Sequence, residues 1–186
     1  MEAALSIYLV GMMGAGKSTV GSRLARRLGR PFVDIDRELE RRLGVDIPTV
    51  FDLEGEAGFR RRECALLEEL SRQPGLVLAT GGGAVVTPAN RDAMRQRGLV
   101  IYLRPTVAEL WQRLRRDRHR PLLKSEDPRG RIRQLAEDRE ALYQEVADHV
   151  VPSGRQPAEH IVDAIVAWLD GPEAEECARC KISLSI

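Results

Sequence analysis

The segment Gly11-Met12-Met13-Gly14-Ala15-Gly16-Lys17-Ser18 decides the fold of this 186-residue chain. It fits the pattern G-x-x-x-x-G-K-[ST] and lies between an apolar run at residues 5–10 and a helical pattern at residues 17–28. In such a loop, glycines let successive backbone N–H groups point at a phosphate, and the N-terminus of the following helix adds positive potential. Because strand, loop and helix are in register, the segment predicts a phosphate-binding loop rather than a chance glycine turn.

The same segment carries side chains that phosphoryl transfer needs. Lys17 can reach the β- and γ-phosphates of a nucleoside triphosphate, and the Ser18 hydroxyl can ligate Mg²⁺. We therefore expect the chain to bind MgATP. The residues expected to contact the nucleotide here are Gly14, Ala15, Gly16, Lys17, Ser18 and Thr19.

Outward from the loop, apolar runs alternate with helical patterns. Runs at residues 31–36, 76–80 and 99–103 are typical of buried strands, and a short fifth strand is expected near residues 148–151. Helices are expected at residues 17–28, 56–71 and 157–170. Two more helices are expected to begin at Thr87-Pro88 and at the capping box formed by Thr106 and Glu109. This alternation predicts an α/β fold whose parallel sheet is covered on both faces, with the active site at the carboxyl ends of the strands.

Two acidic residues end the second predicted strand. Asp34 and Asp36 are spaced i, i+2, so on a strand their side chains point the same way. One could hold Mg²⁺ through water, while the other could orient an attacking hydroxyl or accept its proton. The alternative is a pair of solvated acids at a strand end, and the neighbouring phosphate loop favours the functional interpretation.

Composition limits the other possibilities. The net charge is +1, from 29 basic and 28 acidic residues, so bulk charge does not favour a nucleic-acid partner. No apolar run approaches the ~18 residues of a membrane span, and we recognise no signal peptide. Three cysteines do not suggest a disulfide framework, which favours a reducing cytoplasm. We expect one domain at residues 1–170, a poorly ordered tail at residues 171–186, and no nucleic-acid or membrane partner.

Further segments complete a pattern that resembles the shikimate kinase family over roughly residues 5–170. They are Phe51-Asp52-Leu53-Glu54-Gly55-Glu56-x-Gly58-Phe59-Arg60-x-x-Glu63, Thr80-Gly81-Gly82-Gly83, Arg120-Pro121-Leu122-Leu123 and Arg139-x-x-x-Tyr143. The resemblance implies a five-stranded parallel sheet in the order 2-3-1-4-5, with a mobile lid at about residues 118–130. It also implies a monomer that transfers the γ-phosphoryl group of MgATP to the 3-hydroxyl of shikimate.

The resemblance also assigns roles to acceptor-site residues. It implies that Asp36 contacts the shikimate hydroxyls as base or orienter, and that Asp34 acts on Mg²⁺. Arg60 and Arg139 would hold the shikimate carboxylate, which agrees with the bidentate fork that arginine offers to such a group. The glycine run Gly81, Gly82 and Gly83 would lie near the ring and allow its close approach to the backbone.

On the nucleotide side, the resemblance implies three further contacts. Arg120 would close with the lid onto the transferring phosphoryl group, and with Asp36 and Lys17 it would complete the catalytic set. Arg113 would stack near adenine, with Arg155 and Pro157 lining the other side of the base.

Two other functions remain open on sequence alone. One is a related P-loop kinase for a different polyol acid, such as gluconate, and the other is a nucleotide-binding regulatory module that hydrolyses ATP slowly. Arg60, Arg139 and the triple glycine favour shikimate over gluconate. The Cys177-x-x-Cys180 pair in the tail cannot by itself complete a tetrahedral zinc site.

Overall fold

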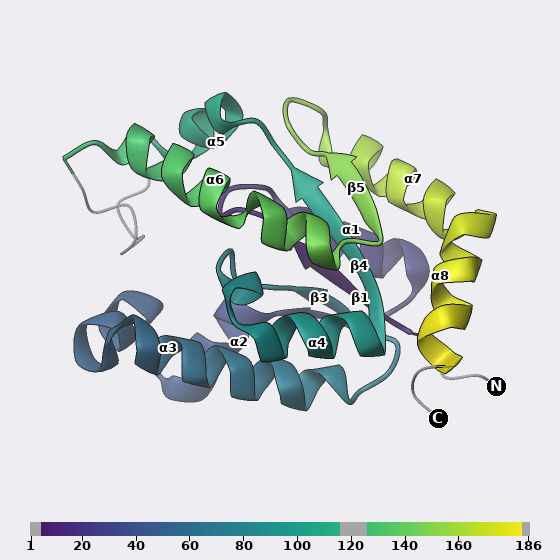
Figure 1. The fold of residues 1–186 in the computed structure, drawn as a ribbon, viewed down its shortest axis with the longest axis horizontal. Helices are drawn as coiled ribbons and strands as arrows, with labels where there is room; N and C mark the ends of the chain where they lie inside the picture. Colours follow the sequence, from purple (N-terminus) through teal and green to yellow (C-terminus); the bar gives the residue numbers. More distant parts are fainter. Residues whose placement is uncertain (1–4, 116–125, 184–186) are drawn as a thin grey trace.

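The computed structural model describes residues 5–115 and 126–183. Its five strands pair in parallel in the order β2-β3-β1-β4-β5, as the family resemblance implied (Figure 1). The strands are β1 Ser6–Val10, β2 Phe32–Asp34, β3 Val77–Ala79, β4 Gly98–Arg104 and β5 His149–Pro152. The order reverses direction at β1, so the phosphate loop after β1 lies at the position where such sheets bind ligands.

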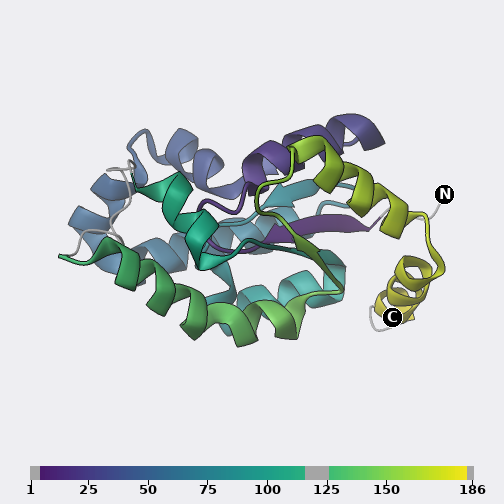
Figure 2. The ribbon, with the colours of Figure 1, turned by 90° about the horizontal axis from the view of Figure 1, so that it is seen from above.

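Helices cover both faces of the sheet. They are α1 Lys17–Leu28, α2 Ile35–Leu43, α3 Ile47–Ser71, the 3₁₀ turn η1 Ala84–Val86, α4 Pro88–Arg97, α5 Val107–Leu114, α6 Pro128–Val146, α7 Ala158–Leu169 and α8 Pro172–Ser183. Figure 2 shows α1 and α7 on one side of the strands and α4 and α6 on the other. No helix within residues 5–115 and 126–183 is both long and apolar enough to cross a bilayer.

Alternate residues of the central strands supply two separate cores. Ile7 and Leu9 of β1 pack with α1 and α7, whereas Tyr8 and Val10 pack with helices on the opposite face. All four side chains are at most 1% exposed, which explains why β1 reads as an unbroken apolar run. The rigid central strand fixes the position of the loop that follows it.

The second strand is shorter than predicted, and this corrects the expected placement of the acids. It ends at Asp34, whose carboxylate accepts a hydrogen bond from the backbone N–H of Arg37 at 3.2 Å and so caps α2. Asp36 therefore lies in the first turn of α2 and not on a strand. The prediction of a strand over residues 31–36 was wrong because an N-cap side chain redirected the backbone after Asp34.

Helix ends agree with the sequence in most places. Thr106 and Glu109 form the expected capping box at the start of α5. Thr87 occupies the N-cap position of α4 with Pro88 in the first turn, but its side chain makes no capping hydrogen bond. Of the predicted lid at 118–130, residues 128–130 belong to α6, and residues 118–125 lie outside the described part of the chain.

The end of the chain differs from the expected tail. Residues 172–183 form α8, which packs against α7, α4 and β4. The ammonium group of Lys181 is buried, donates to the Gly98 carbonyl at 2.7 Å, and donates to the Asp148 carboxylate. This helix was hard to predict because a long polar side chain, that of Lys181, anchors its end.

Candidate active site

A cleft of about 460 Å³ lies at the carboxyl edge of the sheet. It is lined by the six residues predicted to bind nucleotide at positions 14–19, by Asp34 and Asp36, and by Thr80 and Gly82. These groups follow β1, β2 and β3, and parallel strands bring their carboxyl ends to one edge. The phosphate loop, the acid pair and the glycine run thus share one cleft.

The phosphate loop depends on glycine at both of its ends. Gly11 has φ 138°, and a Cβ atom there would collide with the Leu103 carbonyl of β4. Gly16 has φ 98° and forms the N-cap of α1 without any side-chain cap. The first N–H groups of α1 therefore face the cleft without a capping side chain, which suits an anion.

Lys17 is folded into the loop that it follows. Its ammonium group donates to the carbonyls of Gly11 at 2.7 Å and Met12 at 3.0 Å, and the residue is 8% exposed. These contacts keep a buried charge solvated by backbone dipoles. They also hold the ammonium group beside the loop, where it can exchange its carbonyl partners for a bound phosphate.

The Ser18 hydroxyl and the Asp34 carboxylate form a direct hydrogen bond. Both side chains line the cleft next to the phosphate loop. Hydroxyl and carboxylate oxygens are the ligands that Mg²⁺ prefers, and this ion usually takes only one or two protein ligands besides water and phosphate. Ser18 and Asp34 therefore fit the magnesium position that the sequence predicted for them.

Asp36 faces the glycine run together with a buried glutamate. A Cβ atom added to Gly81 would lie 2.9 Å from a carboxylate oxygen of Asp36 and would collide with Glu63. Glu63 is fully buried, and among the described residues its Oε1 atom has no hydrogen-bond partner. Two carboxyl groups thus meet beside a backbone segment that has no side chain.

Electrostatics at Glu63 connect most of the predicted acceptor site. Burial raises the pKa of Glu63, the ion pair with Arg60 opposes that rise, and Asp36 adds to it. The Nη1 atom of Arg60 lies 2.7 Å from Glu63 Oε2. Arg139 also lowers the pKa of Glu63, so its positive charge lies close enough to act on the same carboxyl. Two cations and two acids from three helices therefore converge at this point.

Both predicted carboxylate-binding arginines reach the glycine run. Arg139 is 4% exposed and donates to the Gly82 carbonyl at 3.2 Å. A Cβ atom on Gly83 would collide with the Arg60 guanidinium group. Arg61 and Arg62, the neighbours of Arg60, are exposed. The structure thus brings Arg60 and Arg139 together from α3 and α6, next to the cleft that holds the phosphate loop.

A second cavity of about 530 Å³ adjoins the cleft where adenine was expected. Arg113 and Arg155 line it, and Pro157 is the N-cap residue of α7 just beyond. Arg113 donates to the carbonyls of Gly14 at 2.8 Å and Ser153 at 2.9 Å, and to that of Gly154. Its guanidinium group therefore ties the phosphate loop to the loop after β5, a role that the sequence did not suggest.

For two residues, the sequence prediction and the structure cannot be compared directly. Arg120, the predicted lid arginine, lies outside the described residues, and its role stays a prediction. Glu63 received no role from sequence reasoning, although its spacing from Arg60 places both on one face of a helix. That i, i+3 spacing was the available signal for the pair.

The fold and the site define a P-loop kinase, in which the phosphate loop, the acid pair and the glycine run share one cleft. The shikimate kinase family model matches residues 13–170. This chain therefore belongs to the shikimate kinase family.

Known relatives agree with that assignment. A shikimate kinase of Bordetella avium is 53% identical over 169 residues, covering 91% of this chain and 81% of the relative. One of Aromatoleum aromaticum is 56% identical over 149 residues, covering 80% and 85% of the two chains. The structure of the shikimate kinase from Acinetobacter baumannii in complex with shikimate matches with a TM-score of 0.88 at 46% identity. That match covers 90% of this chain and 94% of the other.

Proposed function

We propose that the chain transfers the γ-phosphoryl group of MgATP to the 3-hydroxyl of shikimate, giving shikimate 3-phosphate and ADP. The carrying observation is that Arg60 and Arg139 both lie against the glycine run whose Gly82 lines the nucleotide cleft. A carboxylate held by these arginines would lie within one small molecule's length of the phosphate loop. Positioning of this kind is the main contribution that a kinase makes to phosphoryl transfer.

The acceptor pocket offers donors and acceptors that match a polyol acid. Arg60 and Arg139 are forks for the carboxylate, and Asp36 would orient the reacting hydroxyl or accept its proton. Glu63 Oε1 and Arg60 Nε are both buried, and among the described residues neither has a hydrogen-bond partner. One unmet acceptor and one unmet donor on two residues that form an ion pair suit a ligand that carries both hydroxyl and carboxylate groups.

On the nucleotide side, residues 14–19 would hold the phosphates, and Lys17 would turn from the loop carbonyls to the transferring group. Ser18 and Asp34 would hold Mg²⁺, which when bound neutralises charge on the phosphate oxygens. Arg113, Arg155 and Pro157 would surround the base, and Arg120 would close over the phosphoryl group.

A coupled ADP-release assay tests this function. We expect rapid ADP release with shikimate, and little with gluconate or without an acceptor. Turnover with gluconate alone would indicate the related polyol-acid kinase, and slow acceptor-independent release would indicate a regulatory ATPase. The first result supports the proposal, and either of the others overturns it.

We also infer a cytoplasmic, monomeric enzyme whose kinase domain spans residues 1–170 and whose lid covers about 118–130. The near-balanced charge and the free thiols of Cys64, Cys177 and Cys180 support this view, with no nucleic-acid or membrane partner.

A further inference from the structure

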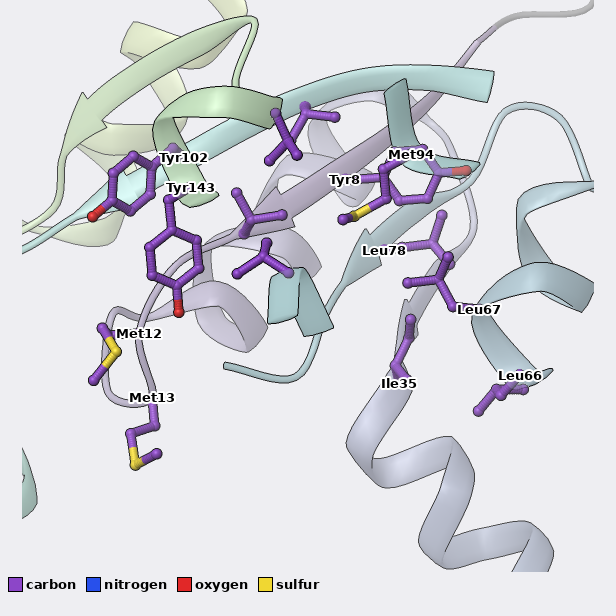
Figure 3. Packing of buried hydrophobic residues seen from close by; sticks show 14 of the residues in the cluster. Tyr8, Met12, Met13, Ile35, Leu66, Leu67, Leu78, Met94, Tyr102 and Tyr143 are labelled. Carbon is purple, nitrogen blue, oxygen red and sulfur yellow. The ribbon is translucent and has the colours of Figure 1, made fainter. Parts of the chain in front are cut away.

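Tyr143 on α6 places a polar group in the core beneath the glycine run. The residue is fully buried, and its ring stacks on Tyr102 with the centroids 4.8 Å apart. Figure 3 shows its hydroxyl pointing away from Tyr102 and toward the side of the core where Met12 and Met13 lie. A phenylalanine would fill the same space without the cost of desolvating a hydroxyl, so the hydroxyl calls for a specific partner.

That partner is the acceptor pocket itself. The Tyr143 hydroxyl donates to the Gly82 carbonyl, which also accepts a hydrogen bond from Arg139 Nη1 at 3.2 Å. Arg139 and Tyr143 are spaced i, i+4 on α6 and lie on one face of the helix. Burial raises the pKa of the Tyr143 hydroxyl, and the positive charge of Arg139 opposes that rise. The hydroxyl and the guanidinium group thus share the Gly82 carbonyl as their acceptor.

Gly82 lies at the junction of the two halves of the site. A Cβ atom at Gly82 would lie 2.8 Å from the backbone nitrogen of Met13, so this turn abuts the phosphate loop. Any shift of the Gly82 peptide would therefore move the surface that the acceptor uses. Two donors from one helix on a single carbonyl restrict such a shift.

We propose that Tyr143 is a positioning residue of the acceptor pocket, which fixes the Gly82 peptide and the Arg139 guanidinium group in the orientation that receives a carboxylate. Tyr143 acts through Arg139 and does not itself touch the acceptor. The inference rests on the proposed function, in which Arg139 holds the carboxylate of shikimate.

Tyr143→Phe removes only the hydroxyl, and Tyr102→Phe is its matched control. Tyr102 is the stacked partner ring, and its hydroxyl donates to Glu140 at 2.8 Å instead of to the glycine run. We expect Tyr143→Phe to raise KM for shikimate ~10-fold, the upper end of the range for a hydrogen bond between neutral groups. KM for ATP should stay within twofold. Tyr102→Phe should leave both KM values within twofold, while both variants lower the melting temperature to a similar degree.

A double-mutant cycle with Arg139→Lys tests whether Tyr143 influences shikimate binding through Arg139. If Tyr143 acts through Arg139, Tyr143→Phe should weaken calorimetric shikimate binding ~10-fold in the wild-type background and less than twofold beside Arg139→Lys. The proposal is overturned if the loss is the same in both backgrounds. It is also overturned if KM for shikimate is unchanged, or if both KM values rise together. A wild-type protein that ignores shikimate would instead refute the proposed function.

Discussion

The hydroxyl of Ser18 donates a hydrogen bond to the carboxylate of Asp34, although β3 separates the strands that precede them. Ser18 lies in the first turn of α1, and Asp34 is both the last residue of β2 and the N-cap of α2. One carboxylate therefore ends a strand, begins a helix and reaches the phosphate loop. The pair presents two oxygen ligands where Mg²⁺ would accompany the nucleotide.

Asp34→Asn should raise the Mg²⁺ concentration for half-maximal activity at least ~10-fold, because an amide is a weaker ligand than a carboxylate for a hard cation. Stability should change little, since asparagine caps a helix about as well as aspartate. Titrating Mg²⁺ at fixed ATP measures the effect. Asp92→Asn, at an exposed position of α4, is the control. An unchanged Mg²⁺ dependence in Asp34→Asn would rule out a metal role for Asp34.

Asp36→Asn should lower kcat by ~10²–10⁴ if the carboxylate helps to remove the proton of the attacking hydroxyl. KM for ATP should change much less, because Asp36 faces the glycine run. Steady-state kinetics with both substrates varied provide the measurement. A loss of less than tenfold in kcat would leave Asp36 as a binding residue only.

Glu63→Gln should change how the free energy of unfolding depends on pH. Burial raises the pKa of Glu63 above its ordinary value of 4.5, so the folded carboxyl binds its proton more tightly than the unfolded one. The stabilisation that comes from this tighter proton binding is complete below pH 4.5, and it is lost as the pH rises through the pKa of the folded state. As the pH falls toward 4.5, wild type should therefore gain stability relative to Glu63→Gln. Urea unfolding at several pH values measures the free energy of unfolding of both proteins. A wild type that gains stability relative to Glu63→Gln as the pH rises would contradict the prediction.

Lys181→Met should lower the free energy of unfolding by about 3 kcal/mol, because the Asp148 carboxylate loses its cationic partner at a largely buried position. Phosphoryl transfer at low temperature should be unaffected, since none of the described residues that line the cleft belongs to α8. Arg179→Met removes an exposed charge from the same helix and should cost less than ~0.5 kcal/mol. Equal melting temperatures for the two variants would show that α8 is not anchored by Lys181.

The features that could be predicted from the sequence are those whose signals lie within one short segment of the chain. The positions and burial of the strands could be predicted because β1 and β4 are continuous apolar runs between turn and cap residues. The order of the strands was implied by the family resemblance. The phosphate loop could be predicted because its glycines, Lys17 and Ser18 are adjacent in sequence. Local patterns of this kind do not depend on the rest of the fold.

The parts that sequence reasoning missed depend on contacts between distant segments. Glu63 gains its role only when Asp36 and Arg139 approach it from α2 and α6. The role of Tyr143 depends on the contact of its hydroxyl with the Gly82 carbonyl, 61 residues away. The last helix was missed because its anchor, Lys181, finds partners at Gly98 and Asp148. Polar side chains of this kind carry no periodic signal.

The most direct test of the proposal that one cleft holds both ATP and the acceptor is isothermal titration of shikimate and of ATP into the wild type and Arg139→Met. The substitution keeps much of the side-chain bulk and removes the fork that reaches Gly82. We predict that shikimate affinity falls at least ~100-fold, as expected when a buried charged partner is lost, while ATP affinity stays within threefold. Equal losses for both ligands, or an unchanged affinity for shikimate, would contradict the assignment of Arg139 to the acceptor carboxylate.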